Sequence, residues 1–123
     1  MEYSTMFQQL ANETRMRIVA LLSQGELCVC GLEEILSIRQ ANISKHLNKL
    51  RQATIVNSRR EKQRVFYYLT ENFLSETHLI RYLEDVILRE PIMQKDHERF
   101  LRHKSEDNDN IYVCNAFKKE NVS

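Results

Sequence analysis

Two short amphipathic segments separated by only three residues place the tightest constraint on the fold of this 123-residue chain. In residues 40–52, Ile43, Leu47 and Leu50 recur at the i, i+4, i+7 spacing of a buried helical stripe. Residues 27–36 carry an apolar stripe of their own, so we expect a helix there as well. Two short helices with a tight turn between them predict a helix-turn-helix.

The hydrophobic period changes directly after this pair. Residues 55–60 and 64–69 are rich in β-prone side chains, and a short polar stretch separates them. This pattern predicts a β-hairpin with a basic tip at residues 59–64. Because the chain has only two glycines and one proline, we expect helices with short connections elsewhere. The predicted fold class is mainly α with a β-hairpin wing, which is a winged helix-turn-helix.

Further helices flank this unit. One ends at Leu10, and the next begins after Asn12, whose side chain can cap it. A fifth helix is expected from Glu71 to about Leu88. Its apolar face is wider than a small domain can cover, which predicts dimerisation through this terminal helix.

The C-terminal part of the chain is less regular. A sixth helix is expected over residues 92–103, followed by a polar linker at 105–110 and an apolar segment at 111–117 that holds Cys114. We therefore predict a DNA-binding and dimerisation domain over residues 1–90, and a C-terminal helix and tail over 91–123.

Positive charge is concentrated in one third of the chain. Residues 39–70 hold eight lysines and arginines and one acid, whereas the remaining residues hold ten basic and sixteen acidic side chains. A neutral chain with one strongly basic third is typical of a small DNA-binding module.

The sequence has no feature of an exported or membrane protein. No apolar run approaches the roughly 20 residues that a membrane helix needs, and the N-terminus does not resemble a signal peptide. Three cysteines, two of them one residue apart, are not a disulfide framework. We therefore expect a cytoplasmic protein.

Three motifs together resemble one family of regulators. LANETRMRI (residues 10–18), ELCVC (26–30) and QANISKHL (40–47) are similar to the opening motif, the cysteine box and the recognition helix of the ArsR/SmtB repressors, in that order. The likeness extends over roughly residues 5–90. It implies a repressor that binds a palindromic operator as a homodimer, and it implies no enzyme activity.

Three positions depart from the family pattern. Arg39 stands where a serine or threonine often caps the recognition helix, a loss of typically about 1 kcal/mol. Thr54 follows Ala53 where a glycine often ends that helix. Glu33 stands where arsenic-responsive members often have a further cysteine.

The expected operator contacts fall on the recognition helix and the wing. Polar side chains that can meet base edges are Gln40, Asn42, Ser44 and His46. Cations that can hold phosphates are Lys45, Lys49, Arg51, Arg59, Arg60, Lys62 and Arg64.

The resemblance also implies a thiol sensor for trivalent arsenic or antimony at Cys28 and Cys30. These ions favour three sulfurs, so Cys114 or a small cellular thiol would supply the third. Residues two apart on a helix point about 200° from each other. We therefore expect ligand binding to unwind the start of the third helix, and the helix dipole to favour the thiolates.

Other signals and another class of protein fit the same residues. Cadmium, lead or mercury can bind three thiolates, and oxidation or persulfidation of the thiols is a further alternative. A thiol enzyme such as an arsenate reductase is the rival from another class. Against this rival, the sequence has no glycine loop that could bind an anion beside a cysteine, because Gly25 and Gly31 do not form one.

Overall fold

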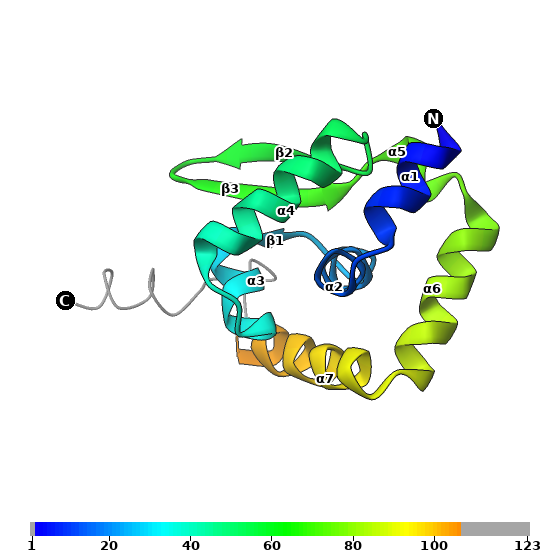
Figure 1. Ribbon diagram of the computed structural model, residues 1–123. Helices are drawn as coiled ribbons and strands as arrows, with labels where there is room; N and C mark the ends of the chain where they lie inside the picture. Colours follow the sequence, from blue (N-terminus) through cyan, green and yellow to red (C-terminus); the bar gives the residue numbers. More distant parts are fainter. Residues whose placement is uncertain (1, 107–123) are drawn as a thin grey trace.

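A computed structural model describes residues 2–106 and confirms a mainly helical fold with a small antiparallel sheet (Figure 1). In chain order the elements are α1 (Tyr3–Leu10), α2 (Glu13–Leu22), β1 (Leu27–Cys28), α3 (Val29–Leu36), α4 (Gln40–Gln52), β2 (Val56–Glu61), β3 (Arg64–Leu69), α5 (Glu71–Leu74), α6 (Thr77–Arg89) and α7 (Pro91–Glu106). None of the helices in this part of the chain is long and apolar enough to cross a bilayer. The segment 111–117 and its Cys114 lie outside the described residues.

Helix α2 forms the centre of the core. Helices α1, α4, α6 and α7 and strand β3 all contact it, and Figure 1 shows it end-on between them. Ile18 and Leu21 are fully buried. The predicted cap is confirmed, because the Oδ1 atom of Asn12 accepts a hydrogen bond of 3.0 Å from the backbone N–H of Arg15.

The predicted helix-turn-helix is confirmed in α3 and α4. Ile43, Leu47 and Leu50 are all buried, as their spacing predicts. The three residues between the helices begin with Ser37 in the left-handed region at φ 57°, which turns the chain sharply and lets α4 pack across α3.

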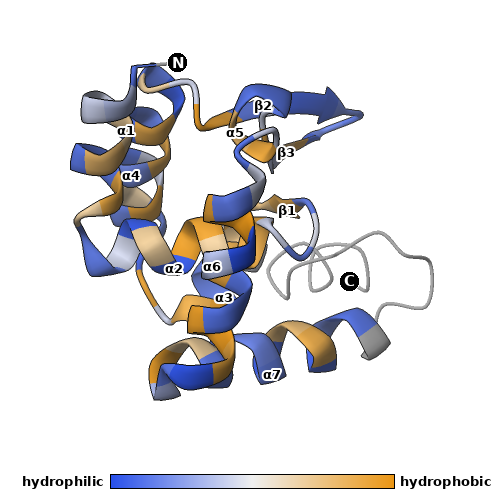
Figure 2. Ribbon diagram, turned by 90° about the vertical axis from the view of Figure 1, so that its right-hand side faces the viewer, coloured by the Kyte–Doolittle hydropathy of each residue, from blue (hydrophilic) through white to orange (hydrophobic). Residues whose placement is uncertain are grey.

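The predicted hairpin is formed by β2 and β3, and a third short strand extends its sheet. The strand order is β1-β3-β2, and Cys28 and Arg59 both pair with Phe66, from opposite sides of β3. Lys62 takes a left-handed φ of 58° at the tip, where glycine is absent. Figure 2 shows a hydrophilic outer end of the hairpin, whereas β1 and the inner part of β3 are more apolar.

Two sequence-based boundaries are wrong. The expected helix over residues 27–36 begins with strand β1, because Leu27 and Cys28 pair with Tyr67 and Phe66 of the wing. The expected helix from Glu71 to Leu88 is two helices. A turn at residues 75–76 ends α5, where the Ser75 hydroxyl donates to the carbonyl of Asn72.

Helix α7 closes the side of the molecule opposite the hairpin (Figure 1). It packs on α2, α3 and α6, and it buries Met93 and Phe100. The side chain of Asp96 is also buried, and it binds the Arg17 guanidinium of α2 through two hydrogen bonds of 2.8 and 2.9 Å.

Candidate nucleic-acid interface and cysteine pair

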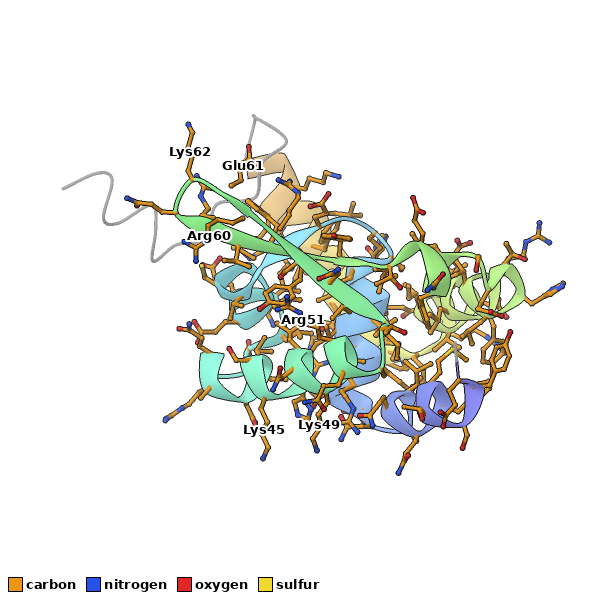
Figure 3. All side chains as sticks on the ribbon, turned by 90° about the horizontal axis from the view of Figure 1, so that it is seen from above. Lys45, Lys49, Arg51, Arg60, Glu61 and Lys62 are labelled. Atoms are coloured by element: carbon orange, nitrogen blue, oxygen red, sulfur yellow. The ribbon has the colours of Figure 1, made fainter. Side chains whose placement is uncertain are left out.

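Helix α4 and the hairpin lie side by side on one face of the molecule. In Figure 3, Lys45 and Lys49 project from the side of α4 turned away from the hairpin, Arg51 lies between helix and strands, and Arg60 and Lys62 mark the hairpin tip. Of the residues predicted to meet base edges, Gln40, Asn42 and Ser44 are exposed. The structure therefore gathers most of the predicted cations on one surface.

The first turn of α4 takes its cap from another helix. Arg39 occupies the N-cap position without a side-chain cap, as its identity predicts. The Oε2 atom of Glu33 instead accepts a hydrogen bond of 2.6 Å from the backbone N–H of Gln40. A carboxylate at this end of a helix also interacts favourably with the helix dipole. The sequence gives no local signal of this contact, because Glu33 lies seven residues away on α3.

His46 lies on the side of α4 that faces α2, where it is half-buried. Its Nδ1 atom is 3.1 Å from Nη1 of Arg15. A guanidinium only donates, so Nδ1 is the acceptor and the ring proton is on Nε2. Burial lowers the pKa of His46, and the positive charges of Arg15, Lys49 and Lys45 lower it further. The neutral ring is thus fixed against α2.

Arg59 differs from the other wing cations. Its guanidinium binds the carboxylates of Glu26 at 2.6 Å and Glu61 at 2.7 Å, and it lies 5.0 Å from the centre of the Phe66 ring. Its charge is therefore compensated within the protein. Arg60 and Lys62 remain exposed at the tip, while the positive charge of Arg64 acts on Cys28.

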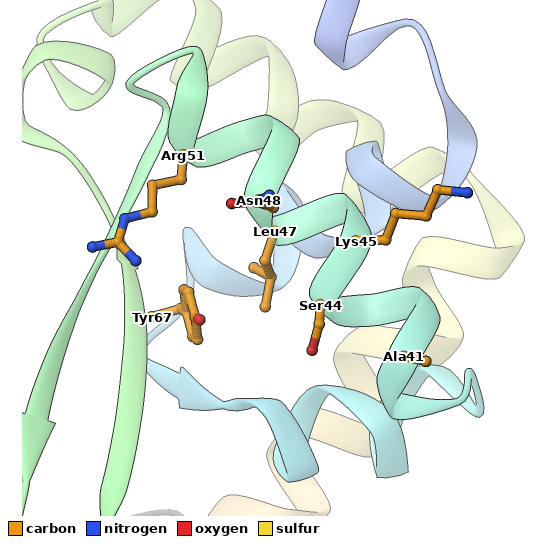
Figure 4. A pocket seen from close by; sticks show the side chains of 7 residues that line it. All are labelled: Ala41, Ser44, Lys45, Leu47, Asn48, Arg51 and Tyr67. Carbon is orange, nitrogen blue, oxygen red and sulfur yellow. The ribbon is translucent and has the colours of Figure 1, made fainter.

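A hollow of about 430 Å³ separates α4 from strand β3 (Figure 4). Its lining residues come from one side of the helix and from one strand; they are Ala41, Ser44, Lys45, Leu47, Asn48, Arg51 and Tyr67. Asn48 and Tyr67 were not among the predicted site residues. The helical period through Ser44 and Arg51 could have indicated Asn48, but only the packing of β3 beside α4 brings in Tyr67.

The two neighbouring cysteines lie close together, contrary to the expected splayed arrangement. Their Sγ atoms are 3.6 Å apart. Cys28 is extended (φ −81°, ψ 167°) and forms the N-cap of α3, so only Cys30 lies within the helix. Two sulfurs bound to one tetrahedral ion at about 2.3 Å would be roughly 3.7 Å apart. The spacing of the pair therefore matches that of two sulfurs on one ion, and the predicted splay is wrong; Cys30 is itself disulfide-bonded in this structure.

At Cys28, burial opposes the expected effect of the helix N-terminus on the thiolate. Its Sγ accepts a hydrogen bond of 3.3 Å from the backbone N–H of Gly31, as a helix N-terminus allows. Burial nevertheless raises the pKa of the Cys28 thiol, because it outweighs this hydrogen bond and the positive charge of Arg64. Within residues 2–106 no third histidine, cysteine or acid completes a metal site with the pair.

Comparisons with known proteins agree with this architecture. Residues 12–58 match the family described as bacterial regulatory protein, arsR family. The chain is 47% identical over 64 residues to an arsenic resistance transcriptional regulator of Pseudomonas putida, which is 51% of this chain and 50% of that protein. It is 46% identical over 66 residues to the arsenical resistance operon repressor of Escherichia coli; the match covers 53% of this chain and 56% of that protein. It is 37% identical over 67 residues to a cadmium resistance regulatory protein of Listeria innocua; the match covers 54% of this chain and 56% of that protein. The chain thus spans about half the length of these curated relatives.

Solved structures give a longer match. Reduced HlyU from Vibrio cholerae is 31% identical, with a TM-score of 0.61 over 72% of this chain and 88% of that one. A homodimeric winged helix-turn-helix domain from Mycobacterium bovis, described as a possible ArsR-family regulator, is 28% identical. Its TM-score is 0.60, and the match covers 70% of this chain and 81% of that one. With its helix-turn-helix, hairpin wing and matching motifs, this chain belongs to the ArsR family of DNA-binding transcriptional regulators and is not an enzyme.

Proposed function

We propose that this protein is a repressor that binds a palindromic operator as a homodimer and releases it when trivalent arsenic or antimony binds Cys28 and Cys30. The observation that carries the sensing proposal is the 3.6 Å separation of the two sulfur atoms. Two sulfurs at this distance can share one soft ion without a change of fold, once a small cellular thiol has reduced the disulfide of Cys30.

DNA binding is supported by the surface that α4 shares with the wing. Gln40, Asn42 and Ser44 are exposed on α4 and can reach base edges in the major groove. Lys45 and Lys49 of the helix, with Arg60 and Lys62 of the hairpin tip, supply the phosphate contacts. His46 and Arg59 already have partners in the free protein, so we place both behind this contact surface.

Dimerisation is supported by apolar side chains on α1 and α6 that the single chain leaves exposed. Phe7 is 56%, Tyr82 59% and Leu88 69% exposed, and the hydroxyl of Tyr3 on α1 donates to Glu76 beside the start of α6. The Mycobacterium bovis relative is a homodimer. A two-fold dimer would place two copies of α4 about one DNA turn apart.

The sheet supplies a route from the thiols to the wing. Cys28 pairs with Phe66, Phe66 pairs with Arg59, and Arg59 binds Glu26, two residues before Cys28. An ion bound to the two sulfurs therefore acts on a strand of the same sheet that holds the hairpin. We propose this route in place of unwinding of α3.

The inducer is assigned to arsenic or antimony because two relatives are named for arsenic resistance. The third sulfur would come from Cys114 or from a small thiol. Cadmium is the second candidate, and the relative named for cadmium resistance favours it.

Operator binding by fluorescence polarisation tests this function. The operator is first selected from a random duplex pool, and the complex is titrated with arsenite, antimonite, cadmium and hydrogen peroxide. We expect arsenite and antimonite to release the native protein but not the Cys28→Ser variant. Serine keeps an acceptor at the N-cap of α3, so this variant should fold.

The other cysteines and the other signals complete the test. Cys30→Ser should behave as Cys28→Ser does, while weaker release of Cys114→Ser would place Cys114 among the ligands. Arsenite release that survives Cys28→Ser contradicts the site. Release by cadmium or peroxide alone assigns the alternative signal, and failure to select any duplex contradicts the repressor.

A further inference from the structure

The hollow between α4 and β3 has the composition of an anion site. Ser44, Asn48 and Arg51 follow one another at i, i+4 and i+7, so they line one side of α4. Tyr67 lies opposite them on β3, and Figure 4 shows the Arg51 side chain reaching from α4 to the strand that carries Tyr67. The lining holds no carboxylate, whereas it holds two cations.

The polar groups of this hollow are available for a ligand. Within the described part of the chain, no hydrogen bond or ion pair engages the side chains of Arg51, Asn48 or Tyr67. Arg59 on the neighbouring strand is the contrast, because two carboxylates hold it. A guanidinium, an amide and a phenol without protein partners form a set of donors that suits a phosphate.

We propose that this hollow seats one backbone phosphate of duplex DNA, with Arg51 and the Tyr67 hydroxyl as its two main donors and Asn48 as a third. The inference rests on the proposed DNA-binding function. DNA is favoured over a free anion because the hollow opens between the two elements that carry the cations of the contact face, α4 and the hairpin (Figure 3). A strand that follows this face from the helix to the wing passes over it.

The salt dependence of the DNA-binding constant shows whether a side chain contacts a phosphate. The probe is a labelled duplex of about 30 base pairs of arbitrary sequence, because phosphate contacts are independent of sequence. For Arg51→Gln, we expect weaker binding and a decrease of about 0.9 per protomer in the slope of log K against log salt. Arg51→Lys should restore the slope.

Tyr67→Phe removes only a neutral donor. Its affinity should fall by about tenfold while the salt slope stays unchanged, because no counterion is released at a neutral group. The matched controls are Lys95→Gln, an exposed cation of α7, and Tyr68→Phe, the next residue of β3, which points to the other side of the sheet. Both controls should bind as the native protein does.

Three results would contradict the proposed phosphate site in this hollow. They are an Arg51→Gln slope equal to that of the native protein, an Arg51→Gln effect no larger than that of Lys95→Gln, and native affinity in Tyr67→Phe. If Lys49→Gln, outside the hollow, weakens binding in the same assay while Arg51→Gln does not, the phosphate site is refuted and the proposed function stands. A native protein that binds no duplex at low salt refutes the proposed function itself.

Discussion

At the scale of the residue, Thr54 ends the recognition helix in a conformation that a threonine rarely adopts. Its φ is 60°, in the left-handed region, which costs a residue with a Cβ roughly 1–2 kcal/mol. The turn still forms, because Ile55 N–H donates to the Leu50 carbonyl at 3.0 Å and the hydroxyl of Thr70 donates to the Thr54 carbonyl at 2.6 Å. The absence of glycine here, visible in the sequence, therefore produces strain and does not change the fold.

Replacing Thr54 with glycine should stabilise the protein. Glycine adopts positive φ without steric cost but loses more entropy on folding, so we expect a net gain of roughly 0.5–1 kcal/mol. Urea unfolding measures it. Thr54→Ala keeps the Cβ and is the matched control. Equal stability of the glycine and alanine variants would show that the φ of Thr54 is not a source of strain.

Local features of single residues could be predicted, whereas their distant partners could not. The Asn12 cap acts three residues along the chain, and the buried stripe of α4 follows from spacing alone. Arg59 was expected to bind DNA phosphate, yet its partner Glu26 is 33 residues earlier. His46 was expected at the bases, yet Arg15 of α2 holds it. Nothing in the local sequence encodes either contact.

At the scale of the element, two departures from the family pattern compensate for each other at the start of α4. Arg39 provides no side-chain cap, and Glu33 of α3 supplies one through its bond to the Gln40 amide. The position that holds a cysteine in many arsenic-responsive members here holds an acid that supports the recognition helix. The cap also joins α3, which starts at the cysteine pair, to the helix proposed to read DNA.

Removing this carboxylate should destabilise the protein unless a local cap replaces it. We expect Glu33→Ala to lower the free energy of unfolding by about 1 kcal/mol, within the range for a lost N-cap. Adding Arg39→Ser should recover most of that loss, because serine caps the same amides from the N-cap position. Urea unfolding of the two single variants and the double variant forms the cycle. Additive effects in the cycle would contradict this compensation.

Element boundaries failed where pairing over a long distance decides them. Strand β1 has two residues, too few for any periodic signal, and it exists because β3 offers an edge to Leu27 and Cys28. That same pairing holds the backbone of Cys28 in an extended conformation and brings its sulfur beside that of Cys30. The error in one boundary and the error in the cysteine geometry therefore have one cause. Helices α4 and α7, whose stripes are long, were predicted much closer to their observed bounds.

At the scale of the whole molecule, α7 is part of the main core. Phe100 belongs to the same apolar cluster as Leu32 and Ile35 of α3. The guanidinium of Arg99 donates to the carbonyl of Glu34 at 2.9 Å, near the end of that helix. The division of the chain at residue 90 remains a prediction, and these contacts indicate how it can be tested. If α7 is a unit separate from residues 1–90, removing its main polar contact should loosen α7 before it loosens the rest of the molecule.

That contact is the ion pair between Asp96 of α7 and Arg17 of α2, whose side chains are only 5% and 12% exposed. We expect Asp96→Ala to cost about 3 kcal/mol, because it leaves a largely buried guanidinium without its carboxylate. Replacing both residues, as Arg17→Met with Asp96→Leu, should restore most of that stability, since no buried charge is left unpaired.

An exposed pair on α6 is the matched control for this substitution. Asp85 lies 2.9 Å from Arg89, and the two side chains are 58% and 62% exposed, so Asp85→Ala should cost no more than about 0.5 kcal/mol. Urea unfolding gives both costs, and hydrogen exchange locates them. Amides of α7 should lose protection in Asp96→Ala before those of α2 do. If both variants lose the same small stability, the buried pair does not hold α7. If α2 and α7 lose protection together, residues 1–90 and α7 unfold as one unit and the boundary at residue 90 is wrong.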